Sequence, residues 1–249
     1  MKRVLAMLLL ASGAAPAAAA EVELAYTEEH LTNGYTRWRT FALGAEWKVG
    51  ERRSAGAAVR DLQRFGLNDL DLGASASVPL GERLVLGGEA TGSPSHHFMP
   101  VASATAELQV DAGGGLVAST GVRWSRYANE AGSSDPVVLR LGLEYYRGAL
   151  RGSWTGFAAT LSGAWSASQR VSLDWYYAEH GRAGVSLNAG RELESTPGKL
   201  LLVTDVVGAA VAGRQGFAGD WSIVWEVGVQ RQGRLYTRTG ARLGLRRSF

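Results

Sequence analysis

Histidine is the most versatile catalytic and metal-binding residue in this sequence, and it occurs at four positions: His30, His96, His97 and His180. A hydrolase with a serine nucleophile needs a histidine beside that serine, together with an orienting carboxylate or amide. None of the serines near the four histidines has a recognisable nucleophile setting. We therefore expect no catalytic residue, and we expect that the protein is not an enzyme.

The adjacent pair His96 and His97 is the strongest candidate for a metal site. Neighbouring side chains of a strand point to opposite faces, so the two rings do not converge on one ion. The surrounding segment also contains no carboxylate that could complete a ligand set. The chain has no cysteine, which removes thiolate ligands, a cysteine nucleophile and disulfides. The sequence therefore predicts no metal site and no cofactor.

A larger set of charged residues recurs at alternate positions along the chain, which predicts that these residues share the inner face of a sheet. Lone charges away from bulk water are costly, so a structural interpretation pairs them across strands. A functional interpretation makes them a selectivity surface for a polar solute. The residues expected to line this inner face are Glu46, Arg60, Asp71, Glu89, Glu107, Arg123, Arg140, Glu144, Asp174, Glu226, Arg238, Arg242 and Arg246.

The segments that carry these charges show the period-two alternation of β-strands. From Phe41 to Val49, apolar residues alternate with small or charged ones. The same alternation runs from Val137 to Tyr146 and from Trp221 to Gln230. A helix would distribute such residues around its axis, so the pattern predicts strands.

About fourteen such segments follow one another, with twelve as the alternative count. They lie near residues 21–30, 36–48, 53–65, 69–79, 83–92, 100–110, 115–127, 136–146, 149–159, 165–178, 182–192, 199–213, 217–231 and 235–249. Longer connections alternate with tight turns, as do the outer loops and periplasmic turns of outer-membrane barrels. We therefore expect an all-β chain that forms a single antiparallel up-and-down barrel.

The composition of the two faces separates a membrane barrel from a soluble β-sandwich. After residue 20 the chain contains only two lysines, Lys48 and Lys199, whereas a water-exposed surface uses lysine freely. Aromatic residues such as Trp47, Tyr145 and Trp221 begin or end the apolar face, as in the girdles at membrane interfaces. These features predict a transmembrane barrel surrounded by outer-membrane lipid and lipopolysaccharide.

The beginning of the chain has the layout of a secretory signal peptide. A basic pair precedes an apolar run from Val4 to Leu10, and small residues offer a cleavage site before Glu21. We expect a signal peptide over residues 1–20 and a barrel over residues 21–249, exported through the periplasm to a Gram-negative outer membrane. Removing the first twenty residues leaves 24 basic and 23 acidic residues, a balance that does not favour a nucleic-acid partner.

The last segment carries one further pattern. Leu243, Leu245 and Phe249 share its apolar face. This arrangement resembles the C-terminal insertion signal of outer-membrane proteins, which the barrel-assembly machinery recognises by β-augmentation. We expect that machinery to be a partner of the chain.

Several short strings are similar to YaiO-type outer-membrane barrels. They are Arg64-Phe65-Gly66 with Asp69, Gly190-Arg191-Glu192, Gly233 to Tyr236 with Arg238, and Leu243 to Phe249. The resemblance covers essentially the whole chain after residue 20 and implies a barrel in the outer membrane. The association of that family with envelope polysaccharide systems adds a polysaccharide to the ligands to be considered.

These patterns allow hypotheses from different functional classes. We favour a non-enzymatic channel, conduit or binding barrel for a small polar solute or an envelope polysaccharide. The alternatives are an outer-membrane enzyme that acts at the rim on lipid or glycan, and a structural barrel with a plugged lumen. Inward aromatic residues could fill a lumen of this size, among them Trp38, Tyr127, Tyr146 and Tyr176.

Overall fold

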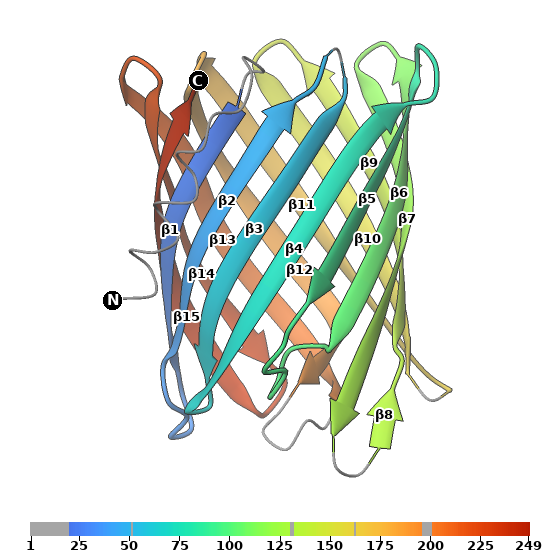
Figure 1. Cartoon of the computed structure of the whole chain (residues 1–249), viewed down its shortest axis with the longest axis vertical. Coiled ribbons are helices and arrows are strands. Elements are labelled where there is room, and N and C mark those ends of the chain that lie inside the picture. Colours follow the sequence, from blue (N-terminus) through green and yellow to red (C-terminus); the bar gives the residue numbers. More distant parts are fainter. Residues whose placement is uncertain (1–19, 51, 130–131, 162, 196–200) are drawn as a thin grey trace.

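The computed structural model describes residues 20–50, 52–129, 132–161, 163–195 and 201–249. Within them, fourteen long antiparallel strands close into one barrel (Figure 1). Each strand pairs with its neighbours along the chain, and the first strand, β1 (Ala20–Leu31), pairs with the last, β15 (Tyr236–Ser248). The predicted up-and-down barrel of fourteen strands is therefore confirmed, and the alternative count of twelve is wrong.

The remaining strands lie between these two. They are β2 (Trp38–Lys48), β3 (Ser54–Arg64), β4 (Leu67–Pro79), β5 (Leu84–Gly92), β6 (Ala102–Gly113), β7 (Leu116–Asn129), β9 (Val137–Arg147), β10 (Leu150–Leu161), β11 (Ala164–Ala178), β12 (Gly181–Ser195), β13 (Leu201–Ala218) and β14 (Trp221–Gln232). A short strand that the sequence did not predict, β8 (Gly132–Ser134), pairs only with the end of β7. The ring closes because β7 also pairs with β6 and β9.

The two ends of the barrel differ in their connections. The backbone N–H of Phe249 donates to the carbonyl of Ala20 at 2.8 Å, so the start of β1 and the end of β15 lie together, at the top of Figure 1. Tight turns lie at this end, helped by Gly81 and Gly148 with φ of 122° and 58°. The opposite end carries the loop of residues 93–101 and the β8 hairpin. We term them the periplasmic end and the outer end, because outer-membrane barrels keep short turns in the periplasm.

Side chains alternate between the outer surface and the lumen. On β9, Leu139 and Leu141 are exposed on the outside, whereas Arg140 between them forms an ion pair with Glu107 in the lumen. Trp165 near the outer end continues the exposed apolar band, as other outward aromatic residues do near the periplasmic end. Such a band is expected where lipid surrounds the strands.

The predicted signal peptide, residues 1–20, lies outside the described residues except for Ala20, where β1 begins. The strands span most of the remaining chain, from Ala20 to Ser248. No helix in the described part of the chain is long and apolar enough to cross a membrane.

Candidate functional site

The lumen is packed at its outer end and hollow further in. Trp38 and Phe98 are only 1% and 3% exposed at the outer end. Two cavities of about 430 and 290 Å³ lie between this packed region and the periplasmic end. We term the hollow region the inner chamber. The packed region is termed the outer plug and is defined by Tyr35, Trp38, Arg64, Phe65, Phe98 and Tyr236.

Trp38 is the first residue of β2 and lies at the centre of the outer plug. The guanidinium groups of Arg64 and Arg238 lie 4.6 and 5.6 Å from the centroid of its ring. The rings of Phe65 and Tyr236 meet it edge-on, with centroid distances of 5.1 and 5.5 Å. Cation–π and edge-to-face contacts each stabilise such a cluster by about 0.5–1.5 kcal/mol. The plug is therefore held by aromatic packing around two cations.

The turn between β3 and β4 delivers Phe65 to this cluster. Phe65 and Gly66 have φ of 53° and 78°, the positive values that a two-residue type I′ hairpin requires. A bulky residue in this region is unfavourable by about 1–2 kcal/mol. The ring contacts of Phe65 with Trp38 and with Tyr35, at 5.7 Å, offset that cost. The strained turn thus places an aromatic ring over the lumen.

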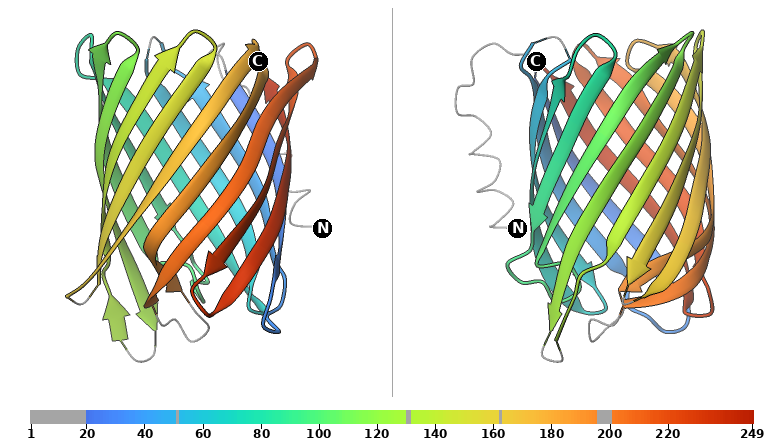
Figure 2. Two further views of the ribbon diagram at one scale, coloured as in Figure 1. Left: turned by 180° about the vertical axis from the view of Figure 1, so that it is seen from behind. Right: turned by 90° about the vertical axis from the view of Figure 1, so that its right-hand side faces the viewer.

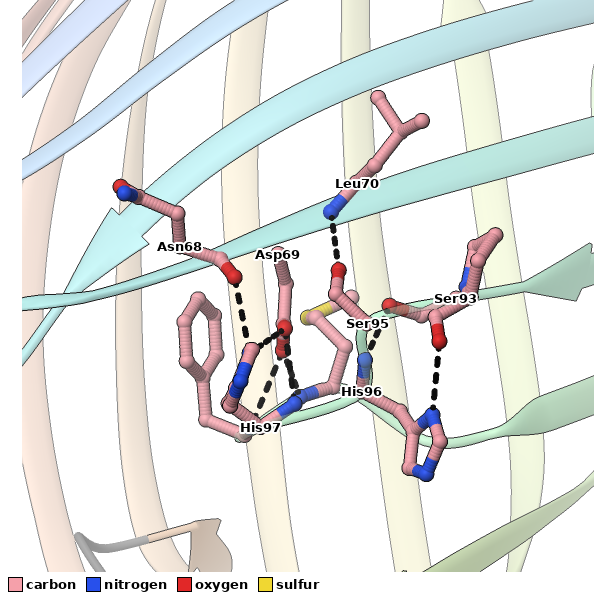
Figure 3. A network of polar contacts seen from close by, with 10 residues as sticks. Asn68, Asp69, Leu70, Ser93, Ser95, His96 and His97 are labelled. Atoms are coloured by element: carbon pink, nitrogen blue, oxygen red, sulfur yellow. Dashed lines mark hydrogen bonds and ion pairs between the residues drawn. The ribbon is translucent and has the colours of Figure 1, made fainter.

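Asp69 on β4 anchors the loop of residues 93–101. Its side chain is completely buried, and its two oxygens accept the backbone N–H groups of three consecutive loop residues (Figure 3). These donors are His97 at 2.7 Å, Phe98 at 2.8 Å and Met99 at 2.8 Å. Nδ1 of His97 lies 2.9 Å from the same carboxylate. Hydrogen bonds to a charged acceptor are about twice as strong as neutral ones, so Asp69 is the main fastener of this loop.

The fastened loop completes the plug. The backbone N–H of Leu70 donates to Oγ of Ser95 at 2.9 Å, a second link between β4 and the loop (Figure 3). Phe98 is thereby held in the lumen, where its ring centroid lies 5.6 Å from the Arg64 guanidinium. The outer closure of the lumen thus depends partly on a loop and not only on the barrel strands.

The four histidine rings do not converge on one site. His97 faces the carboxylate of Asp69, which belongs to β4 and not to the loop, so the sequence of the loop did not reveal it. The ring of neighbouring His96 turns to the backbone carbonyl of Pro94. His180 lies in the turn between β11 and β12, and His30 is exposed near the outer end of β1. Among the described residues, no group of three or more acidic residues or histidines could hold a metal ion.

The charged residues of β15 that the sequence assigned to the inner face pair with carboxylates of β1. These contacts follow the seam where the first and last strands close the barrel. The pairs are Arg238–Glu29 (3.5 Å), Arg242–Glu23, Arg246–Glu23 (2.6 Å) and Arg246–Glu21 (3.0 Å). The three β1 carboxylates were not among the residues predicted for the inner face, although Glu21 and Glu23 alternate with Val22 and Leu24. Their partners on β15 could not be predicted, because no local pattern links strands so far apart in the chain.

The other residues predicted to line the inner face also lie in the lumen. Glu46 and Glu226 line the larger and the smaller cavity of the chamber, and Arg123 donates to Oγ of Ser103 at 3.1 Å. The remaining ion pairs are Arg60–Asp71 (3.2 Å), Arg60–Glu89 (3.4 Å), Arg140–Glu107, Arg151–Asp174 (3.3 Å), Arg151–Glu144 (3.9 Å) and Arg182–Asp174 (3.8 Å). Charges of both signs therefore line the chamber, and most are paired.

Most of the outer plug was missed by the sequence analysis, although it contains residues from the strings that carry the family resemblance. Arg64 and Phe65 belong to one string, and Asp69 fastens the loop that brings in Phe98. Tyr236, from another string, donates its hydroxyl to Glu194 at 2.6 Å. The signal was present as short separate strings, but their convergence at one place appears only in the folded barrel.

Comparisons with known proteins agree with this architecture. A model of the YaiO membrane beta barrel domain matches residues 19–194. A search of curated proteins returned no match. Among solved structures, Pseudomonas aeruginosa OpdQ is 10% identical with a TM-score of 0.52, and 94% of this chain and 99% of that chain are covered.

Two further solved structures are similar. The translocator domain of the autotransporter NalP from Neisseria meningitidis is 12% identical, with a TM-score of 0.50 and coverage of 100% of this chain and 94% of that chain. Outer-membrane expressed OmpT of Vibrio cholerae is 10% identical, with a TM-score of 0.50 and coverage of 95% and 99%. Identities this low show the fold alone. Because the family match spans more than half of the residues, this outer-membrane chain belongs to the YaiO membrane β-barrel family.

Proposed function

We propose that the protein is a non-enzymatic barrel that binds and conducts a polar solute, with the outer plug as a closed gate over the inner chamber. The observation that carries the proposal is the division of the lumen. A cavity of about 430 Å³ lined by charged residues lies behind a plug whose central Trp38 is only 1% exposed. An open pore would not need the plug, and a purely structural barrel would not need the cavity.

The lining of the inner chamber suits an uncharged, hydroxyl-rich solute. Paired arginines and carboxylates present donors and acceptors side by side, and their opposite charges limit the net field on an ion. The smaller cavity adds amides, with Nδ2 of Asn188 lying 3.4 Å from Oε1 of Gln230. Sugars offer many hydroxyl groups that can satisfy such a surface. We therefore favour an oligosaccharide, such as a segment of envelope polysaccharide.

The construction of the plug supports a gate more than a permanent wall. Phe98 enters the lumen from a loop, and loops move more readily than paired strands. The contacts that hold this loop to β4 are concentrated on Asp69 and Ser95. Releasing a few hydrogen bonds would therefore withdraw one side of the plug without unpairing the barrel.

Single-channel recording in planar bilayers tests the proposal. The wild-type barrel is expected to conduct small electrolytes weakly, and the double variant Trp38→Ala, Phe98→Ala is expected to give stable ohmic conductance that added maltooligosaccharides reduce. Tyr146→Ala is the matched control, because Tyr146 is an aromatic residue of the lumen that lies outside the plug. Wild-type conductance as large as that of the double variant would contradict the gate. Conductance without block by oligosaccharide would contradict the solute class.

A plugged structural barrel is the second candidate, favoured by the same burial of Trp38 and Phe98. It predicts that the double variant conducts but binds no oligosaccharide. The non-enzymatic part of the proposal is tested separately, since turnover of lipid or glycan by the purified barrel would contradict it. Contacts with lipopolysaccharide and with the barrel-assembly machinery stay predictions.

A further inference from the structure

The seam between β11 and β12 stops before either strand ends. Their pairing runs from the periplasmic end to Ser168 opposite Gly190. Beyond this pair, β11 continues to Ala164 with β10 as its partner, and β12 continues with β13 as its partner. Within the described residues, no pair joins residues 164–167 of β11 to residues 191–194 of β12. In Figure 2, left, the outer ends of β10 and β11 lean away from β12.

Gly190 is the residue at which the two strands part. Its φ of 137° is in a region that other residues rarely adopt, although it lies inside a strand. A Cβ atom at this position would lie 2.4 Å from the carbonyl oxygen of Ala167 and 2.4 Å from Cα of Ser168. Only a glycine fits this close approach, and the irregular backbone then directs β12 away from β11.

A cavity of about 300 Å³ lies at the point of separation. On the β11 side it is lined by Ser166, Ser168 and Arg170, which face the lumen. On the β12 side it is lined by three consecutive residues, Arg191, Glu192 and Leu193, which alternate between the two faces of the wall. Val138, Phe157 and Ala159 of β9 and β10 complete the lining.

A second hollow of about 530 Å³ adjoins it on the lipid-facing side. Most of its lining is small or apolar, with Trp154, Gly156, Ala167 and Ala189 among the residues of β10, β11 and β12. Residues of β7 and β9 also line it, and the polar members include Thr120, Arg140 and Gln169. The Trp154 ring lies against Gly156, since a Cβ atom there would come within 2.9 Å of it. Phe157 and Ser168 line both hollows, so the two lie next to each other at the part of the wall where β11 and β12 separate.

One buried polar group at this gap lacks a partner among the described residues. Ser166 is only 3% exposed, and within the described part of the chain its hydroxyl has no hydrogen-bond partner. A buried polar group without a partner costs about 1–3 kcal/mol, so a polar group from another molecule would stabilise this hydroxyl. The neighbouring Trp165 is exposed on the outside near the outer end, where aromatic girdles mark the level at which headgroups meet acyl chains.

We propose that the gap between β11 and β12 is a lateral portal that binds a single-chain amphiphile with an anionic headgroup. The headgroup lies between Ser166 and Arg170, and the chain lies in the outer hollow against Trp154. Arg170 and Arg191 outnumber Glu192 at the gap, which favours an anion there. Arg170 also lines the smaller cavity of the inner chamber, so the portal leads from the outer leaflet into the lumen. This site is independent of the solute proposed for the chamber.

Photo-crosslinking tests the portal directly, with diazirine-bearing palmitic acid as the probe and the full barrel in lipid nanodiscs. Crosslinks are expected to concentrate on β10 and β11 around Trp154 and Ala167 rather than spread over all lipid-facing strands. The chain has no cysteine, so single-cysteine variants can be labelled at one place. Labelling Ser166→Cys with benzyl methanethiosulfonate is expected to lower these crosslinks about tenfold, a loss of about 1.4 kcal/mol, and reductant should restore them.

Ser172→Cys carrying the same label is the matched control, because Ser172 also faces the lumen but lies where β11 pairs normally with β12. Its label should leave the crosslinks unchanged. Crosslinks spread evenly around the barrel, or insensitive to the label at residue 166, would overturn the portal. Loss with both labels would also overturn it, because the probe would then enter through the chamber.

A second pair of variants tests the portal without a cysteine label, in case a labelled variant does not fold. Ala167→Trp fills the outer hollow and should reduce crosslinking, whereas Ala74→Trp, at an exposed outward position of β4, should not. Heat-modifiable migration in electrophoresis verifies that each variant forms a barrel. Equal crosslinking in the two variants would overturn the inference. None of these readouts depends on conductance or on oligosaccharide binding, so failure of the chamber proposal is distinguishable from failure of the portal.

Discussion

Replacement of Asp69 by alanine should release the loop of residues 93–101 without dissolving the barrel. Asp69 accepts the backbone N–H groups of His97, Phe98 and Met99 at 2.7, 2.8 and 2.8 Å. The substitution removes the acceptor of all three at once. The barrel strands keep their own hydrogen bonds, so the damage is confined to the plug.

The size of the effect follows from the number of hydrogen bonds. A hydrogen bond to a charged group contributes about 1.5–3 kcal/mol, so three at the lower limit give about 4.5 kcal/mol. Each 1.4 kcal/mol changes an equilibrium constant about tenfold. The equilibrium between closed and open loop should therefore shift toward the open form by about three orders of magnitude.

Amide hydrogen exchange measures this shift at His97, Phe98 and Met99. Asp111→Ala is the control, since the Asp111 side chain accepts a single exposed bond, from the backbone N–H of Gly113 at 2.9 Å. Exchange at Gly113 should rise by no more than about tenfold. If the three loop amides of Asp69→Ala exchange as slowly as in the wild type while the barrel is intact, the assignment of Asp69 as the fastener is wrong.

Three further predictions concern the wall of the barrel. Glu23→Gln should lower the free energy of unfolding in urea by about 1–3 kcal/mol, and by more than Glu21→Gln does. The reason is that Glu23 pairs with two arginines, and its side chain is 14% exposed against 33% for Glu21. Equal losses in the two variants would refute this ranking. Gly190→Ala should lower the temperature at which heating changes the electrophoretic migration of the barrel from the folded to the unfolded position. Gly152→Ala should not lower it, since a Cβ atom at residue 152 meets nothing within 4 Å. Equal transition temperatures in the two variants would argue against the close approach at Gly190. Phe249→Ala should reduce the amount of barrel in outer-membrane fractions but leave the stability of refolded barrel nearly unchanged, because its outward side chain is exposed; a wild-type yield in the membrane would count against the insertion signal.

The sequence by itself determined the architecture of the barrel. Alternation of side chains along an extended backbone is a local property, so residues such as those from Phe41 to Val49 reveal both the strand and its two faces. The turns between the alternating segments predicted about fourteen strands, and the structure decided between fourteen and the alternative of twelve. The same alternation placed charged residues such as Arg140 and Arg242 in the lumen.

Only the tertiary structure decided which residues meet across the lumen and where the wall is incomplete. Asp69 fastens residues about thirty positions away, and Glu23 pairs with Arg242 across 219 positions. The outer plug gathers aromatic residues from β2, β15, the β3–β4 turn and a loop, and the portal arises where β11 and β12 stop pairing. Such contacts depend on the register and closure of all fourteen strands, which no local pattern of the chain encodes.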